Sequence, residues 1–132
     1  MNSKKKEMFI EKLSSKEFER LLYQRLKAIE DVLAIKAREY SDGEDRLLNF
    51  NEGSMITGKC REAVLDGFLL KHYVSYRKML REAANNVHID PAFIKEKFGD
   101  IINYFILQEV QFLHRFERNG NNATEREGSS VG

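Results

Sequence analysis

Residues 89–117 read IDPAFIKEKFGDIINYFILQEVQFLHRFE, and this stretch decides the fold. Its apolar residues recur at the three-to-four-residue spacing of a helix with one buried face. Asp90 is a good N-cap, Pro91 suits the first helical position, and Ile89 can contact Ile94 in a hydrophobic staple. A helix that runs unbroken through this stretch is about 40 Å long at roughly 1.5 Å per residue.

Three further helical patterns precede the long helix, whereas the sequence contains no strand-like alternation of useful length and no internal repeat. The first pattern begins at Ser14, which has the spacing of a capping box with Glu17, and ends near Tyr40. The second pattern covers about residues 45–55, and the third covers about residues 61–84. The whole chain therefore has the pattern of an all-α protein.

Length and composition are those of a single folded domain. The chain has 132 residues, of which 42% are hydrophobic and 33% are charged, so a core can form under a charged surface. We expect a helical bundle of about four helices over residues 14–118. A flexible N-terminus at residues 1–13 and a disordered polar tail at residues 119–132 are expected to flank it.

Charge and cysteine content argue against several classes of protein. The formal net charge of +1 provides no bulk field that would draw the chain to nucleic acid. No apolar run reaches the roughly 18 residues that a membrane span needs. The single cysteine, Cys60, cannot form an internal disulfide, which favours a reducing, cytoplasmic setting. We therefore expect neither a nucleic-acid partner nor a membrane anchor.

The long helix carries a set of oxygen-bearing side chains in apolar surroundings. Glu96, Asp100 and Asn103 lie at positions i, i+4 and i+7 and therefore share one helix face. Carboxylates one turn apart repel each other unless a cation or another helix compensates. A hard divalent cation bound through oxygen is the functional interpretation. A solvated helix face, with Lys97 pairing with Asp100, is the simpler one.

Glu39 is a third acidic candidate, because it borders the apolar stripe of the first helix. If the first and last helices pack together, Glu39 can approach Glu96 and Asp100. Three carboxylates in one place repel strongly unless a cation lies between them. Mg²⁺, held jointly by protein carboxylates and by substrate phosphates, is the usual resolution.

The third helix carries a histidine among apolar residues. His72 lies between Phe68 and Tyr76 on the apolar face, and Lys71 precedes it. A buried, hydrogen-bonded histidine is the simpler interpretation. A phosphate contact from Lys71 or His72 is the functional alternative.

Residues 53–60, GSMITGKC, nearly match the phosphate-binding loop Gly-x4-Gly-Lys-Ser/Thr. The last position is Cys60, so the hydroxyl group that would hold Mg²⁺ is missing, and no strand pattern precedes the segment. We therefore interpret Gly58 as a break between two helices.

Four segments taken together resemble a known family. They are Lys36-Ala-Arg-Glu39-Tyr40, Asp45-Arg46-Leu-Leu-Asn49-Phe50, Lys71-His72-Tyr-Val-Ser75 and Glu96-Lys97-Phe-Gly-Asp100-Ile-Ile-Asn103-Tyr104. Their order and spacing resemble small phage and prophage proteins of the nucleotide modification associated domain type. Those proteins are in turn similar to the MazG-like, all-α nucleoside triphosphate pyrophosphatases.

The resemblance implies an acidic Mg²⁺ site between helices that acts on nucleotide phosphates. The implied reaction is Mg²⁺-dependent hydrolysis of a nucleoside or deoxynucleoside triphosphate between the α and β phosphates. The metal ligands and catalytic residues would be Glu39, Glu96 and Asp100. The substrate-binding residues would be Lys36, Lys71, His72 and Asn103.

The sequence also departs from the family's acidic pattern. The first helix offers Glu39 alone instead of a pair, and Glu96 and Asp100 are spaced by four residues instead of three. The alternative is therefore a non-enzymatic helical module that binds a nucleotide or a protein partner. The broad apolar faces and the resemblance together favour a homo-oligomer, a dimer or larger. The implied location is the cytoplasm of a phage-infected or prophage-bearing bacterium.

Overall fold

The computed structural model describes residues 10–36 and 45–129, with side chains described within residues 10–35 and 45–117. Every regular element in these ranges is helical. The elements are α1 (Ser15–Glu30), the π-helical segment η1 (Asp31–Lys36), α3 (Leu48–Thr57), α4 (Arg61–Ala84) and α5 (Pro91–Ser129). The prediction of an all-α bundle of about four helices is confirmed for the described residues.

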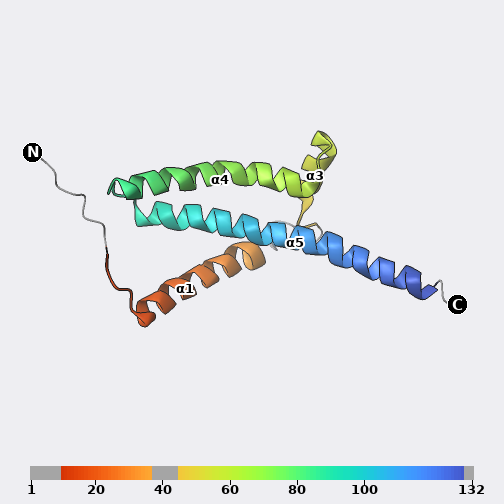
Figure 1. Cartoon of the computed structure of the whole chain (residues 1–132), viewed down its shortest axis with the longest axis horizontal. Coiled ribbons are helices and arrows are strands. Elements are labelled where there is room, and N and C mark those ends of the chain that lie inside the picture. The colour runs from red at the N-terminus through yellow and green to blue at the C-terminus, as the bar shows by residue number, and fades with distance from the viewer. Residues whose placement is uncertain (1–9, 37–44, 130–132) are drawn as a thin grey trace, which may run out of the picture.

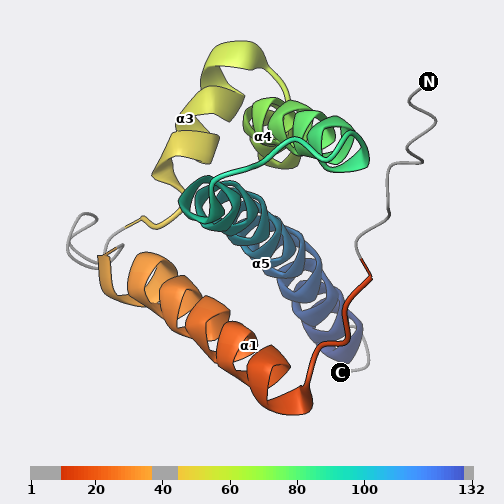
Figure 2. The same cartoon turned by 90° about the vertical axis from the view of Figure 1, so that its left-hand side faces the viewer.

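α5 is the central element of the bundle. α4 and α5 lie side by side and run in opposite directions, and α5 extends past the beginning of α4 (Figure 1). α1 lies along the other side of α5 and runs in the same direction as α5 (Figure 2). The short helix α3 lies at the beginning of α4. The long helix predicted over residues 89–117 is therefore the one that the other helices pack around.

Local backbone chemistry sets several helix ends where the sequence predicts them. Ser14 caps α1 by accepting a hydrogen bond from the Glu17 amide at 3.1 Å. Gly58 ends α3 in a left-handed conformation with φ 72°, and its amide donates to the Ser54 carbonyl. Asp90 caps α5 by accepting from the Ala92 amide at 2.9 Å. The predicted bounds of the third helix, residues 61–84, are those of α4.

Other helix ends differ from the prediction. The second helix begins at Leu48 instead of residue 45, because the Asp45 side chain accepts from the Leu47 amide and keeps these residues in a turn. The last helix continues to Ser129, whereas the sequence analysis placed its end near Glu117 and expected a disordered tail after it. No proline follows Pro91, so no residue there blocks the helical backbone.

The first helix also differs from the prediction, which gave one uninterrupted helix ending near Tyr40. The regular α-helix ends at Glu30 and continues as the π-helical η1 to Lys36. No sequence signal distinguishes these two parts. The predicted end near Tyr40 lies outside the described residues.

The core is small and lies where α3, α4 and α5 meet. Its buried centre consists of Leu47, Phe50 and Leu65, and the half-buried side chains packed against it are Val64, Tyr104 and Leu107. The ring of Phe50 meets that of Phe68 edge to face, with centroids 6.0 Å apart. By contrast, none of the α1 side chains is buried, although α1 is described over its whole length. Burial therefore stabilises the α3–α4–α5 junction far more than it stabilises α1.

Gly53 marks a close approach of α3 to α4, and this makes stability sensitive to a single methyl group. A Cβ atom at Gly53 would lie 2.7 Å from Val64 Cγ1. Alanine gains roughly 1 kcal/mol over glycine inside a helix, but overpacking costs about 1–3 kcal/mol, and the β-branched Val64 moves little. We expect Gly53→Ala to lower the free energy of unfolding by about 1 kcal/mol in urea titrations.

Gly67 provides the matched control for this prediction. It lies inside α4, and a Cβ atom added there would have no neighbouring side chain within 4 Å, so Gly67→Ala should raise stability by up to about 1 kcal/mol. Gly53→Ala combined with Val64→Ala should be less destabilising than the sum of the two single changes. A stabilising effect of Gly53→Ala would show that α3 and α4 do not approach so closely.

Candidate functional site

Two of the predicted site residues meet where α4 packs against α5. His72 Nδ1 of α4 lies 3.5 Å from Asp100 Oδ2 of α5, and the rings of His72 and Tyr104 have centroids 5.3 Å apart. Tyr104 follows Asp100 by one helical turn, so both side chains point toward α4. The seam between the two helices therefore holds a carboxylate, an imidazole and a phenol in contact with one another.

Within this seam the histidine is buried, whereas the carboxylate is partly exposed to solvent. His72 is buried, with 9% of its surface exposed, whereas the Asp100 side chain is 39% exposed. The burial of His72 agrees with the simpler interpretation of this residue. Its Nδ1 lies beside one oxygen of Asp100, and the exposed part of the carboxylate can be reached from solvent.

Asn103 adds a polar atom that lacks a protein partner. It lies one turn beyond Asp100 on α5, and its Oδ1 is buried with no hydrogen-bond partner among the described residues. An unsatisfied buried acceptor costs about 1–3 kcal/mol, so a bound group that donates a hydrogen bond or supplies a cation to it would be favoured. Asn103 Oδ1 thus has unused hydrogen-bonding capacity but is closed to solvent, as are Glu62 Oε1 and Gln111 Oε1 among the described residues.

Of the remaining predicted residues, only Glu96 and Lys71 have described side chains. Glu96 is exposed on α5, where it borders a groove between α5 and α1, and Lys71 is exposed on α4. Lys36 is the last residue of η1, and its side chain lies outside the described part of the chain. Glu39 lies outside the described residues altogether. The structure thus joins His72 to Asp100 and leaves the position of Glu39 untested.

The acidic side chains within the described ranges supply an incomplete ligand set for a metal ion. In residues 10–35 and 45–117, no three His, Cys, Asp or Glu side chains gather closely enough to hold one. Glu96 and Asp100 offer two carboxylates one helical turn apart, both reachable from solvent. Magnesium commonly binds through one or two carboxylates together with substrate phosphates and water. The residues present fit that kind of site and do not fit a closed cage of protein ligands.

α1 and η1 run along α5, and the end of η1 is the described point that precedes Glu39 in the chain. Arg25 of α1 lies level with Lys95 of α5, since its Nη2 donates to the Lys95 carbonyl at 2.9 Å. Further along, Leu33 of η1 borders the same pocket as Ile106 and Val110. The described end of η1 therefore lies beside the middle of α5, beyond the level of Asp100.

The pKa of the Tyr104 phenol depends on its surroundings in the seam. Burial raises the pKa of Tyr104 above the usual 10, and the negative charge of Asp100 raises it further. The folded state therefore favours the neutral phenol, and stability should be full below pH 10 and fall as the pH rises through the higher folded-state pKa. Absorbance titration should show a tyrosine that ionises at a higher pH than an ordinary tyrosine. This signal should be absent in Tyr104→Phe, and it should move to lower pH in Asp100→Asn. A high-pH tyrosine signal that remains in Tyr104→Phe would contradict this assignment.

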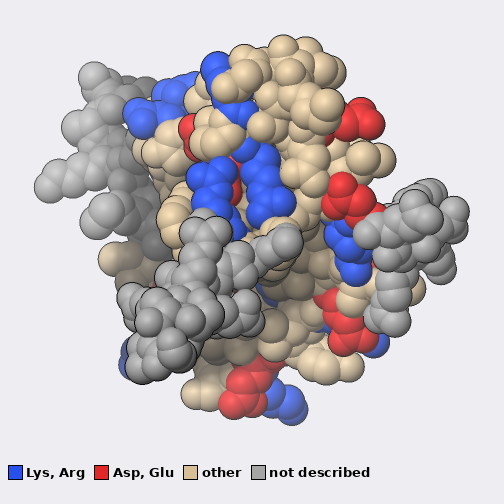
Figure 3. All heavy atoms as spheres, turned by 90° about the vertical axis from the view of Figure 1, so that its right-hand side faces the viewer, with Lys and Arg blue, Asp and Glu red and all other residues tan. Residues whose placement is uncertain are grey.

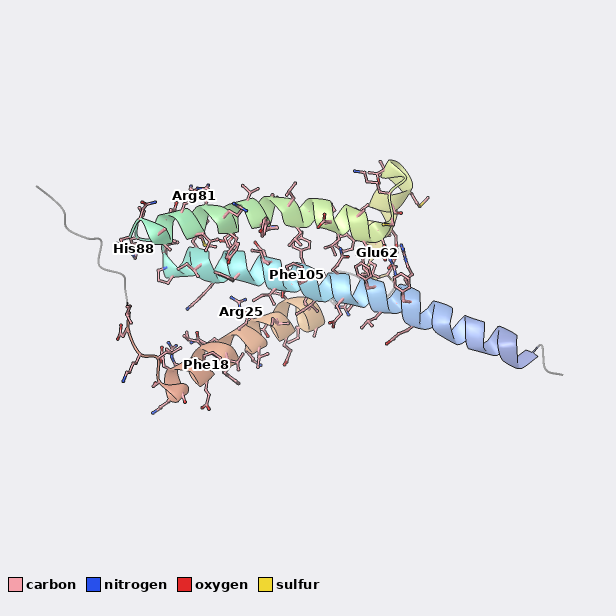
Figure 4. All side chains as sticks on the ribbon, in the orientation of Figure 1. Phe18, Arg25, Glu62, Arg81, His88 and Phe105 are labelled. Atoms are coloured by element: carbon pink, nitrogen blue, oxygen red, sulfur yellow. The ribbon has the colours of Figure 1, made fainter. Side chains whose placement is uncertain are left out.

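A second polar cluster lies at the beginning of α4, and the sequence analysis did not identify it. Glu62 is buried there, and its Oε2 accepts from Arg115 Nη2 of α5 at 2.6 Å (Figure 4). Arg61 Nη2 lies 2.8 Å from His114 Nδ1. Because a guanidinium only donates, that nitrogen is the acceptor and a neutral His114 carries its proton on Nε2. Gln111, fully buried, links the helices by donating to the Arg61 carbonyl.

Basic side chains gather on the end of the molecule where α4 begins (Figure 3). The Glu62 cluster contributes Arg61 and Arg115 to this end, each held by a contact across the α4–α5 interface. The only local sequence signal for it was an acidic residue in the first turn of a helix. We interpret this cluster as a polar connection between the two helices.

Comparison of the chain with protein family models, with curated proteins and with solved structures finds no match. The resemblance described from the sequence therefore stays a prediction. None of the described helices combines the length and the apolar character needed to cross a lipid bilayer.

Proposed function

We propose that the chain binds a nucleoside or deoxynucleoside triphosphate with Mg²⁺ and hydrolyses it between the α and β phosphates. The observation that carries the proposal is the seam in which His72 of α4 lies 3.5 Å from Asp100 of α5. Asn103 follows Asp100 by one helical turn, and its Oδ1 has no hydrogen-bond partner among the described residues. Residues that the sequence assigned to metal and phosphate come from two separate helices, and two of them are in contact.

Each residue has a definite part in this proposal. Glu96 and Asp100 would hold the metal, and His72 keeps the Asp100 carboxylate oriented. When bound, Mg²⁺ would neutralise phosphate charge and acidify a coordinated water. Lys71, exposed on α4, would offset further phosphate charge, and Asn103 would accept a hydrogen bond from the ligand. Lys36, the last residue of η1, and Glu39, in the segment that follows it, are proposed to contribute as well.

The direct test is a panel of nucleoside and deoxynucleoside triphosphates incubated with the full chain and Mg²⁺. We expect release of pyrophosphate with the monophosphate as co-product, and no release when a chelator removes the metal. Release of inorganic phosphate alone would contradict cleavage between the α and β phosphates. No release with any member of the panel would exclude hydrolysis and favour the non-catalytic alternative.

A second proposal concerns partner binding, and exposed apolar side chains favour it. On α1, Phe18 and Leu26 are each 56% exposed, and on α5 Phe105 and Phe116 are 57% and 58% exposed. Exposed apolar surface of this extent is typical of protein interaction sites. We propose a homo-oligomer, a dimer or larger. Sedimentation of the full chain as a monomer at all concentrations would contradict it.

A further inference from the structure

A groove of about 420 Å³ lies between α1 and α5. Its walls are mainly apolar, with Leu21 and Ala28 on the α1 side and Ile94 and Phe98 on the α5 side. Gln24, Arg25, Lys95 and Glu96 add polar groups to its lining. This combination of mostly apolar walls and a few polar groups, within a volume range of roughly 300–1,000 Å³, is typical of small-molecule sites.

Arg25 lines the groove and connects its two walls. Its side chain lies between α1 and α5, where Nη2 donates to the Lys95 carbonyl (Figure 4). Its Nη1 lies 2.8 Å from the position that a Cβ atom on Gly99 would take. The guanidinium therefore occupies the space beside Gly99, where it makes a polar contact between α1 and α5.

Glu96 belongs both to the groove and to the proposed phosphate site. It borders the groove, and it lies one helical turn from Asp100, whose carboxylate faces His72. A nucleotide whose phosphates lie at Glu96 and Asp100 therefore has the groove directly beside it. A second pocket of about 390 Å³ is bordered by Leu33 and His114, and its described lining includes neither Lys71, His72 nor Asn103.

We infer that the α1–α5 groove receives the nucleobase of the nucleotide. This inference rests on the proposed function, since it takes the phosphate position from it. The faces of a heterocyclic base match the apolar walls, including the partly exposed ring of Phe98. The amide of Gln24, which both donates and accepts, matches the polar edge of a base and would discriminate among bases.

The test compares ligands with and without a base. Calorimetric titrations of the full chain with Mg²⁺ would use α,β-methylene nucleoside triphosphates, which resist cleavage between the α and β phosphates, and inorganic tripolyphosphate. We expect the preferred nucleotide to bind at least about 10-fold more tightly than tripolyphosphate, because only the nucleotide fills the groove. Ala28→Phe should remove this preference and leave tripolyphosphate binding unchanged. Ala63→Phe, at an exposed position on α4, is the matched control and should change neither affinity.

A second variant covers the case in which the larger side chain at position 28 prevents folding. Gln24→Ala removes only the polar edge contact, and it should reduce the preference among bases by about 10-fold without altering tripolyphosphate binding. If Gln24→Ala and a folded Ala28→Phe both keep the full nucleotide preference, the groove inference is wrong, while Mg²⁺-dependent nucleotide binding stands. If the unmodified chain binds neither ligand, the proposed function fails and the inference fails with it.

Discussion

Asp100→Asn is expected to reduce nucleotide hydrolysis by about 100-fold or more, corresponding to roughly 3 kcal/mol of lost transition-state stabilisation. The change keeps the shape of the side chain but removes the negative charge that would hold the metal. It also removes the carboxylate that lies 3.5 Å from His72 Nδ1. The expected signature is a lower kcat together with a higher Mg²⁺ concentration at half-maximal rate.

Two comparisons separate a role in the reaction from a general effect on the helix. Glu109→Gln removes an exposed carboxylate from the same helix and should leave kcat and the Mg²⁺ dependence unchanged. His72→Gln should give a smaller loss, of about 10-fold, because His72 positions a ligand and does not hold the metal itself. Hydrolysis at the unmodified rate in Asp100→Asn would remove this residue from the proposed site.

Leu65→Ala is expected to produce the largest loss of stability, about 3 kcal/mol in the free energy of unfolding. Leu65 is completely buried at the centre of a core that has few other buried side chains among the described residues, so it contributes a large share of the buried apolar surface. At this chain length the melting temperature should fall by about 10 °C. Urea unfolding and thermal melting of the full chain provide the measurements.

Leu70→Ala is the matched control for this effect. Leu70 lies on the same helix but is 61% exposed, so its truncation should change stability by no more than about 0.5 kcal/mol. Equal losses for the two variants would mean that the junction of α3, α4 and α5 is not the main core. A milder effect of Leu65→Ala than of Leu70→Ala would place Leu65 at the surface.

Features decided by neighbouring residues were predictable from the sequence. The caps at Ser14 and Asp90 and the left-handed end at Gly58 depend on side chains and backbone groups within a few positions. The helical spacing of apolar residues between these ends then predicted how many elements there are and that each is a helix. The π-helical η1 and the continuation of α5 to Ser129 were not predicted, because no strong stop or start residue marks them.

Contacts between helices were harder to predict than the helices themselves. Spacing placed Asp100 and Asn103 on one face of the last helix, but it did not give the register of that helix against α4. The pairing of Asp100 with His72, and that of Glu62 with Arg115, depends on this register. Whether Glu39 joins the other acidic residues depends on chain geometry after Lys36, outside the described residues.

The lack of buried side chains in α1 has a consequence for how the molecule moves. Segments with little buried apolar surface open at a lower free energy than the rest of a protein. α1 should therefore exchange its amide hydrogens with deuterium sooner than α4 does, through excursions that leave the α4–α5 hairpin intact. A small molecule seated between α1 and α5 would suppress those excursions, so ligand capture and the docking of α1 would be thermodynamically linked.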